Sequence, residues 1–224
     1  MLATGPSDEW GPAAERLGLL VRVGTTACPT VTGMLCFGIE PQFLYPQWSL
    51  GAVRIHGRTL ADRLGTSETF EGSLPVLLKS ATSFIRTHTR SLDDAVAGGV
   101  ASEYPEEAVR EALVNAFVHR DLRHPGRVAI QIFDDRLIIR SPGGVMNGVP
   151  PLDQLSIEGG ESIPRNPLLA ATARHLGLCE QVGRGLTVIR RAMSAATREP
   201  TRIVATASEV RLILPSRFSS SEFS

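Results

Sequence analysis

The segment 106–121 constrains the fold of this chain more than any other part of the sequence. Pro105 suits the first turn of a helix, and Glu106 and Glu107 lie where the positive end of a helix dipole favours acidic side chains. Residues three and four apart share one face of a helix, and four apolar residues have that spacing: Val109, Leu113, Ala116 and Phe117. The pattern predicts a helix that packs this stripe on a sheet and ends near residues 121–123.

The other side of this helix carries polar side chains. Glu111 and Asn115 lie one turn apart, and we expect both to face away from the core, with His119 beside them. An Asn oxygen can ligate Mg²⁺, and a Glu can orient or deprotonate the water that attacks a terminal phosphate. A Glu-x-x-x-Asn pair by itself is more typical of a solvated helix face, so the spacing alone leaves both interpretations open.

Two glycine-rich sites follow the helix. Gly143 and Gly144 end a strand, and Gly183-Arg184-Gly185 opens a helix. Glycine lets backbone N–H groups approach a ligand closely, and a helix N-terminus favours phosphate. Each site alone is also explained by an ordinary turn or loop. Their order is more specific: a Glu/Asn helix, a hairpin, a glycine pair, a long loop, a second glycine pair and a helix.

The remaining elements follow from periodicity and from breaks at Gly and Pro. We predict further helices over 12–20, 74–89, 168–176 and 185–196. We predict strands over 34–37, 52–56, 202–207 and 209–214, and a hairpin over 128–139 that turns at Asp134-Asp135. Residues 58–72 and 145–162 are expected to be loops, and 91–103 a connection or an irregular strand.

Composition narrows the class of protein. Hydrophobic residues make up 42% of the chain, which supports a real core, and Lys+Arg 23 balances Asp+Glu 23. A neutral chain lacks the broad positive field that non-specific nucleic-acid binding needs. Three cysteines without metal-ligand spacing indicate a reducing compartment. With no signal-peptide pattern and no apolar run of about 20 residues, we expect a soluble cytoplasmic protein with no membrane partner.

Several runs of residues resemble bacterial ATP-binding proteins often labelled RecG-related. The resemblance is carried by residues 111–121, 132–137, 141–144, 165–168, 176–178 and 183–185, and upstream by 17–20, 29–38, 41–42 and 70–75. These proteins look like members of the superfamily that contains gyrase B subunits, MutL and histidine kinases. They usually carry an N-terminal Schlafen/AlbA-type DNA-binding domain, and we expect this chain to begin after it, as a fragment or as a variant without it.

The resemblance implies roles for particular residues. Glu111 would be the general base and Asn115 the ligand of Mg²⁺. Gly143 and Gly144 would shape the adenine and ribose side of an ATP pocket, and residues 145–182 would act partly as a lid. Gly183 and Gly185 would close the phosphate side. His119, Arg120, Ser141 and Arg184 are further candidate ATP contacts, and the position of His119 fits helix packing as well as contact with phosphate. Ser141 stands where the superfamily usually places an adenine-binding Asp.

The fold implied is an α+β two-layer sandwich of the Bergerat (GHKL ATPase) type with a small strand-containing N-terminal extension. We expect the extension over 1–72, the ATP-binding domain over 73–215 and a flexible tail over 216–224. The resemblance implies ATP and Mg²⁺ as ligands. It also allows a homodimer, and contact with DNA only through a missing or separate N-terminal domain.

Three functions remain open at this point. The first is a Mg-ATP-binding domain that acts as a slow ATPase or a nucleotide-dependent switch in a DNA-associated or regulatory bacterial protein. The second is a degenerate, non-hydrolysing interaction or dimerisation module, and the third is a DNA-binding transcriptional regulator. If the chain is an enzyme, it is an ATP hydrolase and not a helicase, because Lys79 follows Leu78 and no Walker A sequence is present.

Overall fold

A computed structural model describes residues 7–94, 99–146, 149, 152, 163–179 and 184–218. The elements in chain order are α1 (Ser7–Arg16), β1 (Leu20–Val23), β2 (Thr26–Pro29), α2 (Val31–Phe37), η1 (Pro41–Phe43), η2 (Pro46–Trp48), β3 (Leu50–His56), β4 (Arg63–Phe70), α3 (Leu74–His88), β5 (Ser91–Asp94), β6 (Gly99–Ser102), α4 (Glu106–Val118), β7 (Val128–Ile132), β8 (Arg136–Pro142), α6 (Pro167–His175), α7 (Gly185–Ala196), β9 (Arg202–Ala205) and β10 (Glu209–Pro215).

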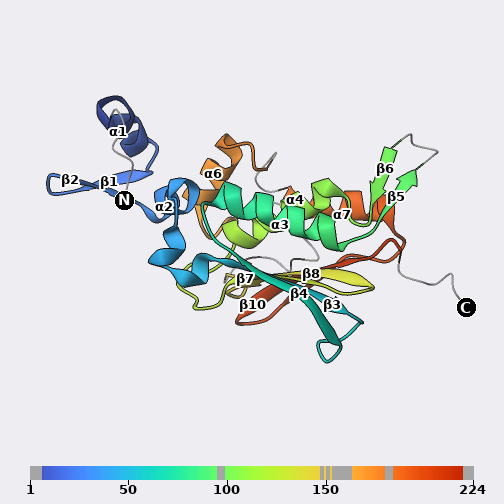
Figure 1. Cartoon of the computed structure of the whole chain (residues 1–224). Helices are drawn as coiled ribbons and strands as arrows, with labels where there is room; N and C mark the ends of the chain where they lie inside the picture. The colour runs from blue at the N-terminus through green and yellow to red at the C-terminus, as the bar shows by residue number, and fades with distance from the viewer. Residues whose placement is uncertain are drawn as a thin grey trace, which may run out of the picture.

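The centre of the molecule is a six-stranded sheet in the order β4-β3-β7-β8-β10-β9. Strands β3 and β7 run parallel and every other neighbouring pair is antiparallel. Helices α3, α4 and α7 lie on one side of this sheet (Figure 1). The predicted α+β fold with a mixed, mostly antiparallel sheet is therefore confirmed, as is the hairpin formed by β7 and β8.

The main core fills the space between these helices and the sheet. Alternate residues of β7, Val128 and Ile130, are fully buried there with Leu113 and Phe117 of α4 and Leu77 of α3. The alternation arises because side chains of a strand point to opposite faces in turn, so only every second residue of β7 meets the helices. This core fixes how α4 lies across the sheet.

Two local predictions were wrong. Residues 34–37 form part of helix α2 rather than a strand, and the Thr30 hydroxyl caps this helix by accepting a hydrogen bond from the Gly33 N–H at 3.1 Å. Residues 58–72 contain strand β4, which pairs antiparallel with β3 at the edge of the sheet. The first error arose because a run of four apolar residues fits a helix as well as a strand. The second arose because the mostly exposed side chains of β4 lack the alternation of apolar and polar residues that predicts a strand.

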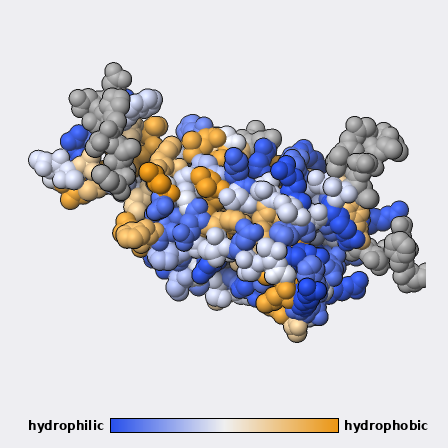
Figure 2. Space-filling view, in the orientation of Figure 1, coloured by the Kyte–Doolittle hydropathy of each residue, from blue (hydrophilic) through white to orange (hydrophobic). Residues whose placement is uncertain are grey.

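The first elements lie at one end of the molecule, where α1 and the β1–β2 hairpin stand beside the helical layer (Figure 1). Apolar side chains gather on the surface over α2 and the turns that follow it (Figure 2). Phe37, Ile39 and Phe43 are 54%, 71% and 85% exposed. Exposed apolar area of this kind is uncommon on a monomeric surface and distinguishes this end from the rest of the molecule.

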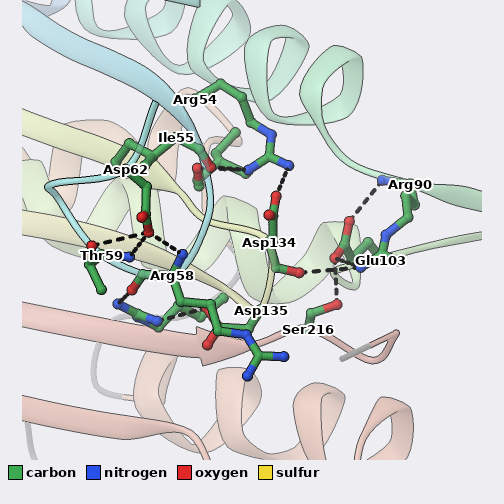
Figure 3. Close-up of polar contacts among 12 residues, drawn as sticks. Arg54, Ile55, Arg58, Thr59, Asp62, Arg90, Glu103, Asp134, Asp135 and Ser216 are labelled. Atoms are coloured by element: carbon green, nitrogen blue, oxygen red, sulfur yellow. Dashed lines mark hydrogen bonds and ion pairs between the residues drawn. The ribbon is translucent and has the colours of Figure 1, made fainter. Parts of the chain in front are cut away.

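A polar network lies just ahead of the first residue of α4. Glu103 is buried and accepts hydrogen bonds from the Ser216 hydroxyl and, at 2.8 Å, from the Arg90 N–H. Arg54 is paired with Asp134 close by (Figure 3). These contacts connect the residue before β5, the residue after β6 and the residue after β10. They therefore hold together three segments that are far apart in the sequence.

Candidate functional site

Helix α4 packs against β8, α3, α6 and α7. The predicted apolar stripe is buried, and the helix ends at Val118 with His119 as its C-cap, a few residues before the predicted end. The expectation that Glu111 and Asn115 face away from the core was wrong for Glu111, which is only 3% exposed. The reason is that α7 covers this side of α4, which an analysis of one helix by itself does not reveal.

The first residue of α7, Gly185, lies directly against the Glu111 and Asn115 side chains of α4. A Cβ atom built on Gly185 would lie 2.5 Å from Asn115 Nδ2 and 3.1 Å from Glu111 Oε2. A methylene group does not fit at such distances without a shift of the Asn115 side chain. Glycine at position 185 therefore lets the start of α7 lie directly against the predicted Glu/Asn pair.

The N-terminus of α7 has no capping hydrogen bond from the side chain of its N-cap residue, Arg184. The first N–H groups of a helix have no partner within the helix, and they carry a partial positive charge. Gly185 and Leu186 line a pocket, so this end of α7 offers N–H donors next to Asn115.

The pocket runs along α4, and its lining also includes residues of α7, β8, β9 and β10. One wall is the apolar inner face of the sheet, with Ile139, Ile203, Val210 and Leu212. The polar side chains on its lining, among the described residues, are Asn115, His119, Ser141 and Arg165. A mostly apolar lining with a few polar groups is the usual composition of a ligand pocket.

Ser141 and His119 have defined hydrogen-bonding and charge states. The buried Ser141 hydroxyl donates to the Ala116 carbonyl oxygen at 2.7 Å, which leaves the hydroxyl oxygen as an acceptor toward the pocket. Burial lowers the pKa of His119, and the positive charge of Arg165 lowers it further. His119 is therefore a neutral imidazole near pH 7, and Arg165 carries the charge on this wall.

The two glycines after β8 are required by packing. Gly143 has φ +90°, and a Cβ built on it would lie 2.6 Å from Asp121 Cβ. A Cβ on Gly144 would lie 2.4 Å from the Thr206 carbonyl oxygen. Gly144 also lines the pocket, whereas Gly143 is not part of the lining. Close backbone approach, which sequence reasoning predicted for a ligand, here serves contacts within the protein as well.

Two other predicted contacts, Arg120 and Arg184, are not part of the pocket lining. Arg120 is fully buried outside the pocket and donates to the carbonyl oxygens of Gln47 at 3.1 Å and Gly126 at 2.9 Å. Burial lowers the pKa of this guanidinium to about 10, so it stays charged as a structural link. Arg184 is exposed and is not part of the lining. Gly183 lies outside the described residues.

Sequence reasoning did not place Arg165 in the site, and it did not identify the neighbouring Asn166 as an anchor of this segment. Arg165 lines the pocket, with its Nη1 3.1 Å from Asp121 Oδ2 and its Nη2 donating to the Gly144 carbonyl oxygen. Asn166 Nδ2 donates to the Val118 and Arg120 carbonyl oxygens, both at 2.9 Å. The run 165–168 was part of the family resemblance, which was the signal that these residues have a specific environment.

The site has the groups that a magnesium–nucleotide complex needs. Mg²⁺ is usually held by one or two protein oxygens together with phosphate oxygens and water. The Asn115 carboxamide meets the first need, and the α7 N-terminus lies against it. No cluster of three or more His, Cys, Asp or Glu residues suited to a metal occurs in the described part of the chain. The metal would therefore depend on the bound phosphates.

The fold and the site define an α+β protein with a small-molecule pocket between a Glu/Asn helix and a glycine-led helix. Residues 126–214 match the family model described as "Putative ATP-dependent DNA helicase recG C-terminal". The match supports a RecG-related, ATPase-like domain and confirms the resemblance. It begins after α4, so Glu111 and Asn115 lie upstream of the matched residues.

The comparison with solved structures supports the fold. The DIP2311 protein from Corynebacterium diphtheriae superposes with a TM-score of 0.67 at 22% identity, over 94% of this chain. The match spans 43% of that protein, so this chain corresponds to less than half of its length. A search of curated proteins gave no match. None of the described helices is both long enough and apolar enough to span a membrane.

Proposed function

We propose that this chain is a Mg-ATP-binding domain of the Bergerat type that works as a slow ATPase or a nucleotide-dependent switch. The observation that carries the proposal is the contact of Gly185 with Asn115 and Glu111 at one end of an apolar pocket. The start of α7, the Asn115 carboxamide and the Glu111 carboxylate come together there. In this proposal they would bind phosphate, bind Mg²⁺ and act on water, respectively. The ATPase-like family of residues 126–214 supports the same chemistry.

Each group then has a defined role. The apolar wall of the sheet would cover the base, and the N–H groups at the start of α7 would hold the phosphates. The Asn115 oxygen would hold Mg²⁺, which supplies charge neutralisation of the phosphates when bound. Glu111 would orient a water and accept its proton.

The proposed slow rate follows from the position of Glu111. Its carboxylate is buried beneath the start of α7, next to Gly185. A water molecule reaches it only if the start of α7 moves or if the bound nucleotide reshapes this end of the pocket. Hydrolysis would then be limited by a conformational step, as in other enzymes with closing segments.

Thermal unfolding with and without Mg·ATP tests the proposal, with ADP and a non-hydrolysable analogue as comparisons. At a ligand concentration a hundredfold above Kd, binding should add about 2.7 kcal/mol, which for a chain of this size raises Tm by roughly 5–10 °C. The increase should require magnesium and disappear in Asn115→Ala. Glu111→Ala serves as the matched variant: it should keep the shift and lose phosphate release.

No shift at millimolar Mg·ATP in the wild-type chain would overturn the proposal and favour a non-hydrolysing interaction module. A shift that is unchanged in Asn115→Ala would also contradict it, because the metal-dependent part of the binding would then lie elsewhere. Phosphate release that persists in Glu111→Ala would remove only the role of that carboxylate.

A further inference from the structure

Arg165 is the only charged side chain on the pocket lining within the described ranges. It lies at the start of the segment that leads into α6, and its side chain is 20% exposed. Asn166 follows it and binds two carbonyl oxygens at the end of α4. This anchor fixes the backbone next to Arg165, so the guanidinium is held in place rather than free to extend into solvent.

The hydrogen-bonding edge of this guanidinium is already used by the protein. Nη1 pairs with Asp121 and Nη2 donates to the Gly144 carbonyl oxygen. A guanidinium binds phosphate most strongly through two parallel N–H donors, and each of these two nitrogens already has one of its two N–H groups committed to the protein. Arg165 is therefore poorly prepared to act as a phosphate clamp.

The feature of Arg165 that best suits a ligand in this pocket is the flat face of the guanidinium, which stacks on planar rings. The Nε atom is enclosed by the protein and is out of reach of a ligand. Opposite groups of the lining form an apolar wall on the inner face of the sheet, which suits a planar ring system. A planar contact of this kind fits the base end of a nucleotide.

We propose that Arg165, locked by Asp121 and Gly144, is a nucleobase-binding residue that stacks its guanidinium face on the base of the bound nucleotide. The inference rests on the proposed nucleotide site and adds the residue that recognises its base. The charge on Arg165 is partly offset by Asp121, so its contribution comes from the planar contact more than from attraction of phosphate.

Arg123 offers a matched control. It also pairs with Asp121, through an Nε–Oδ1 contact of 3.1 Å, but its side chain is 89% exposed and is not part of the pocket. Arg123→Ala removes the same unit of charge and a contact to the same carboxylate without touching the lining. Arg165→Lys keeps the charge and removes the planar face, so it separates stacking from electrostatics.

Binding affinities for ATP, ADP and AMP, measured by calorimetry on the four proteins, test the inference. We expect Arg165→Ala to weaken binding about tenfold, the magnitude of one desolvated stacking contact of a cation on a ring. The loss should be the same for ATP, ADP and AMP, nearly as large in Arg165→Lys, and absent in Arg123→Ala. If AMP binds too weakly to measure, the ATP and ADP values decide.

A loss that grows with the number of phosphates, or a full rescue by Arg165→Lys, would overturn the inference and make Arg165 a phosphate contact. An equal loss in Arg123→Ala would assign the effect to Asp121, and unchanged affinity in Arg165→Ala would also overturn it. Absence of binding in the wild-type chain would instead refute the nucleotide site itself, and the inference with it. Unfolding temperatures without ligand separate loss of binding from loss of fold.

Discussion

Two glutamates, one just ahead of α4 and one within it, are almost equally buried and differently surrounded. Glu103, ahead of α4, is 4% exposed and receives hydrogen bonds from Ser216 and Arg90 (Figure 3). Glu111, within α4, is 3% exposed and lies beside Gly185 and behind Asn115. The first carboxylate is enclosed by segments that it ties together, and the second adjoins a pocket.

The comparison teaches that burial alone does not identify a functional carboxylate. A buried charge is expensive unless hydrogen bonds compensate it, and Glu103 is compensated by the chain itself. Its partners come from the start of β5 and from the residue after β10, so its role is to join distant segments. The neighbours of Glu111 include the start of a helix and a pocket-lining carboxamide, which are groups that a ligand can engage.

The largest expected effect is on stability, in Glu103→Ala. This change leaves the Ser216 hydroxyl and the Arg90 N–H without an acceptor in a buried place, and we expect the free energy of unfolding to fall by about 2–4 kcal/mol. Glu111→Ala should change it by less than about 1 kcal/mol, because active-site groups are commonly not optimised for stability. Urea unfolding of both variants measures the difference.

The Glu103→Gln variant is the control for this prediction. Its amide oxygen can still accept from Ser216, so it should recover part of the loss. Equal destabilisation by Glu103→Ala and Glu111→Ala would break the comparison and make Glu111 a structural residue like Glu103.

The next effect distinguishes two glycines that both line the pocket. A Cβ on Gly144 would meet the Thr206 carbonyl oxygen, which is backbone, whereas a Cβ on Gly185 would meet the end of the Asn115 side chain. We expect Gly144→Ala to lower the free energy of unfolding by about 1–3 kcal/mol, as in other overpacked sites. Gly185→Ala should barely lower it, because the carboxamide can shift and Ala favours the helix.

Nucleotide affinity should respond in the opposite order. Displacement of Asn115 in Gly185→Ala should weaken Mg·ATP binding by about tenfold or more, since small misplacements at such sites are costly. Titration calorimetry measures this, and thermal unfolding without ligand gives the stability of each variant. Normal affinity in Gly185→Ala would show that the α7 contact does not position Asn115.

Much of the fold was predictable because its elements are locally encoded. The start of α4, the β7–β8 hairpin and the whole of α7 agree with the predicted ranges, since acidic first-turn residues, alternation and a leading glycine specify them. Strand β4 was missed because an edge strand with exposed polar side chains is defined by its pairing with β3 rather than by its own pattern.

The site was predictable in part. Asn115, Ser141, Gly144 and Gly185 do meet at the pocket, because the order of motifs along the chain reflects one folded arrangement. The cover that α7 places over Glu111 and the place of Arg165 depend on packing between segments far apart in sequence. Helical periodicity carries no information at that range. The same limit explains why Arg120, next to the site in sequence, lies in the core instead.

A smaller effect concerns pH and the C-cap residue of α4, His119. The pKa of His119 is below its ordinary value of 6.5 because of burial and Arg165, so below that pH the unfolded chain binds more protons than the folded one. Stability should therefore fall as the pH drops below about 6.5, with a slope of at most about 1.4 kcal/mol per pH unit. His119→Gln should remove this component, as seen in urea unfolding from pH 7.5 to 5. An unchanged slope would contradict it.

The smallest effect is expected from Asp121, which links Arg123 and Arg165. Hydrogen bonds from Arg123, with its charge and that of Arg165, lower the pKa of this carboxyl from 3.8 to about 2. Its contribution to stability is thus complete above about pH 4 and is lost as the pH falls toward 2. Because the pair is partly solvated, we expect less than about 1 kcal/mol. Acid unfolding of Asp121→Asn, compared with the wild type, should differ above pH 4 and converge near pH 2. A difference that persists at pH 2 would mean that this side chain stabilises the fold through packing rather than through its charge.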